Sequence, residues 1–107
     1  MMTESELVAA IGSLDREAVQ RWIDLGWIVP DRDMQELRFD AADVARVRLI
    51  CELHYELRIE ESSMSVVLSL LDQLYAARRS LRALTSAVAA QPDDVRASIA
   101  ALAQGKL

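Results

Sequence analysis

The sequence is poor in residues that interrupt helices or cross-link chains. It holds only three glycines and two prolines among 107 residues, so long helices are expected and long irregular loops are not. Cys51 is the single cysteine, which excludes an intramolecular disulfide and fits a reducing compartment. No uncharged apolar run reaches the length of about 18 residues that a membrane-spanning helix needs. These features, with an N-terminus unlike a signal peptide, predict a soluble cytoplasmic protein.

The sequence also lacks the residue groupings that carry enzyme chemistry. One histidine, His54, does not support a Ser/His/Asp or Cys/His/Asn set, and the glycines are too scattered for a phosphate loop. Cys51 and His54 lie three residues apart, which could be half of an intersubunit metal site, although ordinary packing of both is the favoured interpretation. We therefore predict a protein that is not an enzyme and has no catalytic residue, no metal and no cofactor.

The first part of the chain has the pattern of a helix-turn-helix. Thr3 and Glu6 form a capping-box pattern before a short helix that should end at Gly12. Ser13 is then expected to cap a second helix that runs to about Leu25, with Gly26 as its left-handed stop. Apolar residues recur at helical spacing along the second helix, and two short helices joined at residues 12–13 predict a helix-turn-helix.

A short hairpin, or wing, is predicted next. The β-prone run Trp27–Val29 and the segment Leu37–Phe39 are the expected strands, with polar residues 31–36 as the turn between them. Asp40 should cap a third helix that runs to about Arg58. The apolar face of that helix is expected to consist of Val44, Val47, Ile50, Cys51, Tyr55 and Leu57.

A long helix over about residues 62–90 carries an apolar stripe with heptad spacing. The stripe consists of Val67, Leu70, Leu74, Ala77, Leu81, Leu84 and Val88, and a second stripe of Met64, Leu68, Leu71 and Tyr75 covers only the first half. We predict pairing with a second copy through the longer stripe; the alternative is packing wholly within one small domain. The chain is thus divided into a winged head (residues 1–60), the long helix (61–90), and a short closing helix and tail (91–107).

Negative charge is concentrated in the first 40 residues. Residues 1–40 hold four arginines against nine carboxylates, a net charge of −5, whereas residues 41–107 hold eight of each sign. Such a surface should repel nucleic acid and attract a cationic protein. The predicted partner face consists of Asp15, Glu17, Asp24, Asp31, Asp33 and Glu36, with Trp27 either an exposed anchor or part of the core. A merely soluble acidic surface is the alternative interpretation.

The segment Val19–Pro30 resembles the MerR family of transcription regulators. That family typically shows Thr-x-Arg-x-Tyr-x-x-x-Gly-Leu-Ile-x-Pro there, and Trp22, Gly26, Ile28 and Pro30 fit the pattern. The resemblance covers about residues 5–75 and implies a mainly α, winged helix-turn-helix architecture with a long C-terminal dimerisation helix. Gln20 stands where the family has arginine, and the predicted turn is acidic where the family's is rich in Arg, Asn and Gly.

The chain also resembles chaperone modulators of the CbpM type. The segment Glu56–Glu60, followed by Met64 and residues 66–74, is similar to their Glu-Leu-x-Leu-Asp…Ile-x-Val-x-Leu-x-Leu-Met-Asp pattern, although Glu61-Ser62 replaces the usual Trp-Pro. That family binds the J-domain of a DnaJ/CbpA-like co-chaperone and inhibits its action with Hsp70. J-domains present a basic helix, which an acidic head complements.

Three hypotheses follow from these patterns. The leading one is a homodimeric modulator of a DnaJ-like co-chaperone. The second is a small MerR-like regulator that binds DNA through Arg16, Arg21, Arg32 and Arg38. The third is a structural dimerisation module, and a basic cluster at Arg78, Arg79 and Arg82 is assigned to a solvated flank of the long helix.

Overall fold

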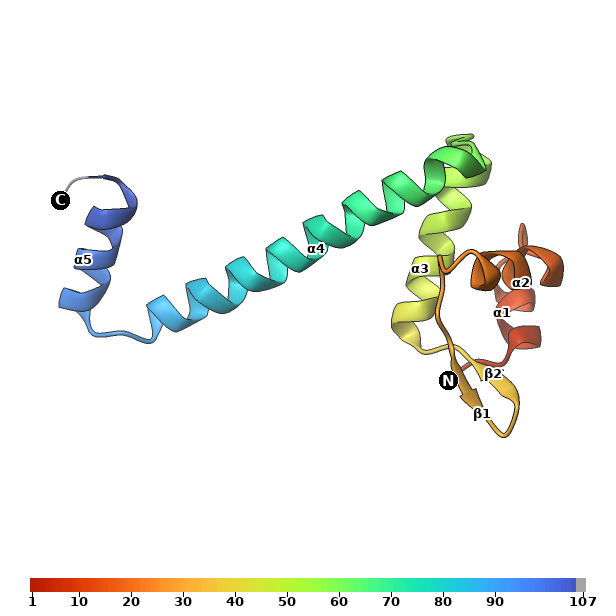
Figure 1. Ribbon diagram of the computed structural model, residues 1–107. Helices are drawn as coiled ribbons and strands as arrows, with labels where there is room; N and C mark the ends of the chain where they lie inside the picture. The colour runs from red at the N-terminus through yellow and green to blue at the C-terminus, as the bar shows by residue number, and fades with distance from the viewer. Residues whose placement is uncertain (106–107) are drawn as a thin grey trace. The chain divides into compact units, whose positions relative to one another are not determined.

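The predicted mainly α fold with a two-stranded hairpin and a long helix is confirmed. The computed structural model describes residues 1–105, and its two compact units are Met1–Leu68 and Ser69–Leu107. Figure 1 shows the elements, which are α1 Glu4–Ala10, α2 Arg16–Asp24, β1 Asp31–Asp33, β2 Glu36–Arg38, α3 Ala41–Cys51, the π-helix η1 Glu52–Glu56, α4 Glu61–Ala89 and α5 Asp93–Ala103. The three-part division made from the sequence stays a prediction.

A single apolar core holds the first unit together. It is built from buried side chains of α1, α2, the hairpin and α3, and the first two turns of α4 complete it with Met64 and Leu68. Both side chains are almost fully buried, at 0% and 2% exposure. The chain start also joins this unit, because Met2 and Phe39 exchange two backbone hydrogen bonds of 2.8 Å. The head therefore does not end before α4 begins.

The helix-turn-helix forms, but its second helix starts later than predicted. Asp15, not Ser13, is the N-cap of α2, and its carboxylate accepts from the Ala18 N–H at 2.8 Å. Either residue type can cap a helix; here Leu14 precedes the cap and is buried, so the turn must continue past Ser13 to bring Leu14 into the core. At the first helix, Thr3 caps as predicted, accepting from the Glu6 N–H at 3.2 Å.

The end of α2 is a Schellman motif centred on Gly26. This glycine has φ +77°, and the Trp27 N–H donates back to the Trp22 carbonyl at 2.9 Å while the Gly26 N–H donates to Ile23 at 3.0 Å. The accompanying apolar contact joins the two indole rings of Trp22 and Trp27, whose centroids lie 6.2 Å apart. The predicted glycine stop is therefore confirmed.

The first strand of the hairpin lies later in the chain than predicted, whereas the second strand, Glu36–Arg38, is within one residue of the expected Leu37–Phe39. Part of the segment expected to be the turn forms β1: Asp31 pairs with Arg38, Arg32 with Leu37, and Asp33 with Glu36. The turn itself is only Met34–Gln35. The run Trp27–Val29 is not a strand, because Trp27 and Ile28 are drawn into the core at 4% and 1% exposure by the Schellman turn.

The third helix starts as predicted and ends in an unusual way. Asp40 and Asp43 form a full capping box, with each carboxylate accepting from the other residue's N–H. After Cys51 the helix widens into η1, and a left-handed Arg58 (φ +56°) ends it. This widening changes the face that the chain presents, so Tyr55 and Leu57 are exposed rather than buried as predicted.

The fourth and fifth helices have the expected bounds to within a few residues. Pro92 is the N-cap of α5. In the second unit, large side chains of the predicted pairing stripe are open to solvent: Leu70, Leu74, Leu81 and Leu84 are 59%, 44%, 62% and 63% exposed. The closing helix is confirmed; of the tail predicted to follow it, residues 106 and 107 lie outside the described residues.

Candidate partner-binding surface

The six carboxylates predicted to form a partner face are all exposed. We call them the acidic set. They form two groups, one on the N-terminal and C-terminal ends of α2 and one along the hairpin: Asp15, Glu17 and Asp24, and then Asp31, Asp33 and Glu36. Exposure leaves these charges hydrated and acting at a range set by the Debye length of about 8–10 Å.

Three members of the acidic set also stabilise the fold locally. Asp15 caps α2, Asp24 accepts from the Gln20 side-chain amide at 3.1 Å, and Glu36 pairs with Arg38 at 3.1 Å. Capping by Asp is worth about 1 kcal/mol, whereas an exposed ion pair contributes about 0.2–1 kcal/mol. Glu17, Asp31 and Asp33 are therefore the members whose substitution tests binding with least damage to the fold.

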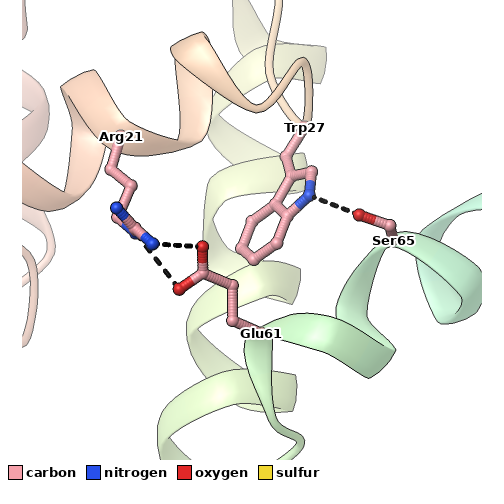
Figure 2. Close-up of polar contacts among 4 residues, drawn as sticks. All are labelled: Arg21, Trp27, Glu61 and Ser65. Atoms are coloured by element: carbon pink, nitrogen blue, oxygen red, sulfur yellow. Dashed lines mark hydrogen bonds and ion pairs between the residues drawn. The ribbon is translucent and has the colours of Figure 1, made fainter.

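Arg21 of α2, one of the four arginines of the DNA-binding hypothesis, pairs with a carboxylate of α4. Arg21 Nε donates to Glu61 Oε2 at 3.1 Å and Arg21 Nη2 donates to Glu61 Oε1 at 2.5 Å, a bidentate pair (Figure 2). The pair is partly solvated, since Arg21 is 62% and Glu61 38% exposed. It offsets part of the positive charge of Arg21 and links α2 to the first turn of α4.

The other arginines of the alternative DNA-binding hypothesis are distributed differently. Arg16 donates to the Ser5 hydroxyl, and Arg38 is shared with Glu36 on its own strand. Arg32 lies exposed on β1 between two aspartates. Two of the four arginines, Arg21 and Arg38, thus already face a carboxylate, which reduces the positive potential available to a phosphate.

Trp27 is a core residue and not an exposed anchor. Its indole is 4% exposed, and its Nε1–H donates to the Ser65 hydroxyl at 3.1 Å (Figure 2). A buried indole needs a partner for that hydrogen, and α4 supplies it. Its backbone carbonyl accepts from Arg46 Nε at 2.5 Å. Trp27 is therefore not available as part of the predicted partner face. Trp22 is also in the core, at 3% exposure.

Cys51 and His54 are both engaged by groups of their own chain. Burial raises the pKa of the Cys51 thiol, and this outweighs the opposing effects of the Ser13 hydroxyl and Arg48. His54 Nδ1 lies 2.8 Å from the Ile59 carbonyl, so Nδ1 carries a hydrogen when this bond forms. Throughout residues 1–105 no group of three or more His, Cys, Asp or Glu side chains could hold a metal ion.

Two features of the surface were missed by the sequence analysis. The Arg21–Glu61 pair joins residues 40 positions apart, and no local pattern indicates it. Met34 is 95% exposed at the hairpin tip; its signal was available, since it is the one apolar residue in the polar stretch Asp31–Glu36.

The fold and this surface define a winged helix-turn-helix protein. The chain matches the family described as "MerR HTH family regulatory protein" over residues 4–86, which covers α1 to most of α4. It therefore belongs to that family of MerR-like regulators, whose members are in general not enzymes. No curated protein and no solved structure matches the chain. Over the described residues, none of the helices is long and apolar enough to cross a bilayer.

Proposed function

We propose that the chain is a regulator that acts by binding protein: its acidic head docks on the J-domain of a DnaJ/CbpA-like co-chaperone and inhibits the action of that co-chaperone with Hsp70. The observation that carries the proposal is the charge of the surface that a DNA-binding relative would turn toward the duplex. On α2 and the hairpin, six carboxylates are exposed, while Arg21 and Arg38 are paired with carboxylates.

The physical argument is one of complementary potentials. A surface with net negative charge raises the rate of encounter with a cationic partner and lowers it for a polyanion. The basic helix of a J-domain carries the positive charge that such a surface would attract. The resemblance to chaperone modulators is what suggests a J-domain as the partner. Because an acidic face suits other cationic proteins too, the J-domain has to be tested directly.

The test is a charge reversal that should change the affinities for the two candidate partners, the J-domain and duplex DNA, in opposite directions. We expect the double variant Glu17→Lys/Asp33→Lys to bind a purified J-domain about tenfold more weakly at low salt, which corresponds to about 1.4 kcal/mol. The same variant should bind duplex DNA more tightly than the wild type, because two phosphate-repelling charges become attractive. Binding is measured by titration calorimetry or anisotropy, and Hsp70 ATPase stimulation reports the inhibition.

The matched control reverses a charge far along the chain from the head. Asp94 is exposed in the first turn of α5, so Asp94→Lys makes half of the same charge change and should leave J-domain binding unaltered. Asp15 is unsuitable as a test residue because it caps α2. Wild-type protein that binds duplex DNA at micromolar concentration with a steep salt slope, and does not bind the J-domain, contradicts the proposal.

We further propose that the protein acts as a homodimer through α4. The stripe from Val67 to Val88 keeps heptad spacing, and its leucines are exposed in the single chain. Apolar a and d positions of this kind pair with those of a second helix. Sedimentation of wild type and of Leu74→Asp/Leu81→Asp separates the outcomes: the wild type should sediment as a dimer and the variant as a monomer.

The second candidate is a small MerR-like transcription regulator. Family membership supports it, and so does Arg32, which lies exposed on the wing. Under this alternative, Arg32→Ala should lower DNA affinity roughly equally for all sequences and reduce the salt slope by about one. The same variant should leave J-domain binding intact or improve it.

A further inference from the structure

The tip of the hairpin presents an apolar side chain that packs on nothing in its own chain. Met34 is 95% exposed, the largest exposed fraction among the large apolar residues described. Burying a methionine would remove apolar surface from water and stabilise whatever complex buries it. An unbranched thioether chain also adapts to an irregular pocket, which is why methionine recurs at recognition surfaces.

The backbone at this tip is one that methionine and glutamine rarely adopt. Met34 has φ +50° and Gln35 φ +69°, and together they form a two-residue turn between Asp33 and Glu36. A turn with positive φ at both central residues favours Asn-Gly, because a Cβ crowds the backbone there; glycine has none, and the short polar side chain of Asn compensates by hydrogen bonding locally. The chain thus carries a large apolar group at a place where the fold alone would favour a small polar one.

The charges around Met34 indicate what it can approach. Asp33 and Glu36 flank the turn directly, and Asp31 lies two residues before Asp33 on the same strand. Arg32 and Arg38 lie on the same two strands, so the hairpin carries three negative and two positive groups. An apolar tip edged by carboxylates fits a protein pocket that is apolar at its base and cationic at its rim, the arrangement of a buried anchor with a charged periphery.

We propose that Met34 is the apolar anchor of the partner-binding surface, held out by the strained hairpin turn to enter an apolar pocket rimmed by Lys or Arg on the partner protein. The inference rests on the proposed function and deepens it, because it gives the acidic set a residue that supplies buried apolar contact. The acidic set then contributes the rate and orientation of encounter, and Met34 contributes the lifetime of the complex.

Three single substitutions separate the side chain of Met34 from the strain of its turn. Met34→Asn relieves strain and removes the anchor; Gln35→Gly relieves strain and keeps the anchor; Met34→Leu keeps both the strain and an apolar side chain. Each protein is assayed for thermal unfolding, for affinity to a purified J-domain, and for affinity to duplex DNA. Met34→Asn and Gln35→Gly should each raise Tm by a few degrees, on the order of 4–8 °C.

The affinity for the J-domain is expected to depend on the side chain at position 34 and not on the thermal stability of the variant. Met34→Asn should weaken J-domain binding at least about tenfold, while Gln35→Gly and Met34→Leu stay within about threefold of the wild type. The variant that folds more stably would then bind less well, which a general loss of structure does not produce.

The remaining outcomes overturn the inference in distinguishable ways. If the wild type binds the J-domain and Met34→Asn binds it equally well, the anchor is refuted while the proposed function stands. If Met34→Asn and Gln35→Gly lose affinity together while Met34→Leu keeps it, the shape of the turn matters and the apolar side chain does not. If the wild type fails to bind the J-domain, both proposals fall. If Met34→Asn instead weakens duplex binding, Met34 is an apolar wedge for DNA.

Discussion

Replacing Gly26 with alanine isolates the contribution of one backbone conformation to the stability of the helix-turn-helix. Gly26 ends α2 at φ +77°, and an added Cβ would meet no atom within 4 Å. No neighbour therefore has to move, and the whole effect is the local clash of a Cβ with its own backbone. The same residue positions Trp27, whose N–H donates to the Trp22 carbonyl in the Schellman motif.

The magnitude follows from two opposing effects. A non-glycine residue in the left-handed region costs about 1–2 kcal/mol, while alanine restricts the unfolded chain and returns about 0.4–1 kcal/mol. The net prediction for Gly26→Ala is a loss of about 1 kcal/mol, which lowers Tm by about 4–8 °C for a core of this size. Thermal unfolding followed by far-UV circular dichroism and by tryptophan fluorescence measures it, since Trp22 and Trp27 adjoin the site.

The matched control is Gly12→Ala. An added Cβ at Gly12 also meets nothing within 4 Å, but its φ is not in the left-handed range. This variant should be neutral or slightly more stable, by up to about 1 kcal/mol. If Gly26→Ala is as stable as Gly12→Ala, the positive φ does not govern the end of α2 and the reasoning is refuted.

Three further predictions test the core, the capping box and the thiol. Met64→Ala should destabilise the first unit by about 2–5 kcal/mol, because Met64 is fully buried, whereas Val66→Ala, at a position 60% exposed, should stay within about 0.5 kcal/mol in the same urea titration. Burial, and then repulsion from Asp40, raise the pKa of the Asp43 carboxyl despite the Asp40 N–H bond that lowers it. The stability that this group adds is therefore present below the unfolded pKa of about 4 and is lost as pH rises through the raised native pKa. In Asp43→Asn the free energy of unfolding should depend less on pH across this range. An unchanged pH dependence of the free energy of unfolding would contradict the assignment. Iodoacetamide should alkylate Cys51 at least about tenfold more slowly in the native protein than in urea, because burial both shields the thiol and raises its pKa.

Local signals predicted those parts of the fold that local chemistry decides. Asp40 with Asp43 gave the start of α3, and Gly26 gave the end of α2, because a cap and a left-handed stop each depend on a few adjacent residues. The start of α2 was misplaced by two residues because Ser13 and Asp15 are both good caps. The burial of Leu14 decided between them, and burial depends on the whole core.

The first strand of the hairpin was misplaced for a related reason. Trp27 and Ile28 have strong β propensity, but propensity in a short run is weaker than the gain from burying an indole and an isoleucine against α2 and α4. The strands then formed from Asp31–Asp33 and Glu36–Arg38, a polar stretch without a favourable turn pair. Local propensity and tertiary structure conflict most at Met34 and Gln35, and such conflicts often mark a functional segment.

The sequence could predict which charges the surface of the head carries, but not which of them form ion pairs. Net charge by segment indicated an acidic head, and the exposed acidic set agrees with that expectation in placement. No sequence pattern could show that Glu61 would pair with Arg21, since a contact across 40 residues depends on how α4 begins against α2. Without that pair, Arg21 would present an unpaired positive charge on α2.

The carboxylates of the head therefore divide by what they do. Asp15 and Asp40 cap helices and Glu61 holds an arginine, so their charges would be retained even in a protein with no cationic partner. Glu17, Asp31 and Asp33 neither cap a helix nor pair with an arginine, although Glu17 lies in the first turn of α2, where a negative charge is mildly stabilising. Asp31 and Asp33 lie on the same hairpin as the unburied Met34, and this is the part of the surface that we propose meets a cationic, partly apolar partner. Only the second group of charges, substituted without touching the first, reports on binding and not on folding.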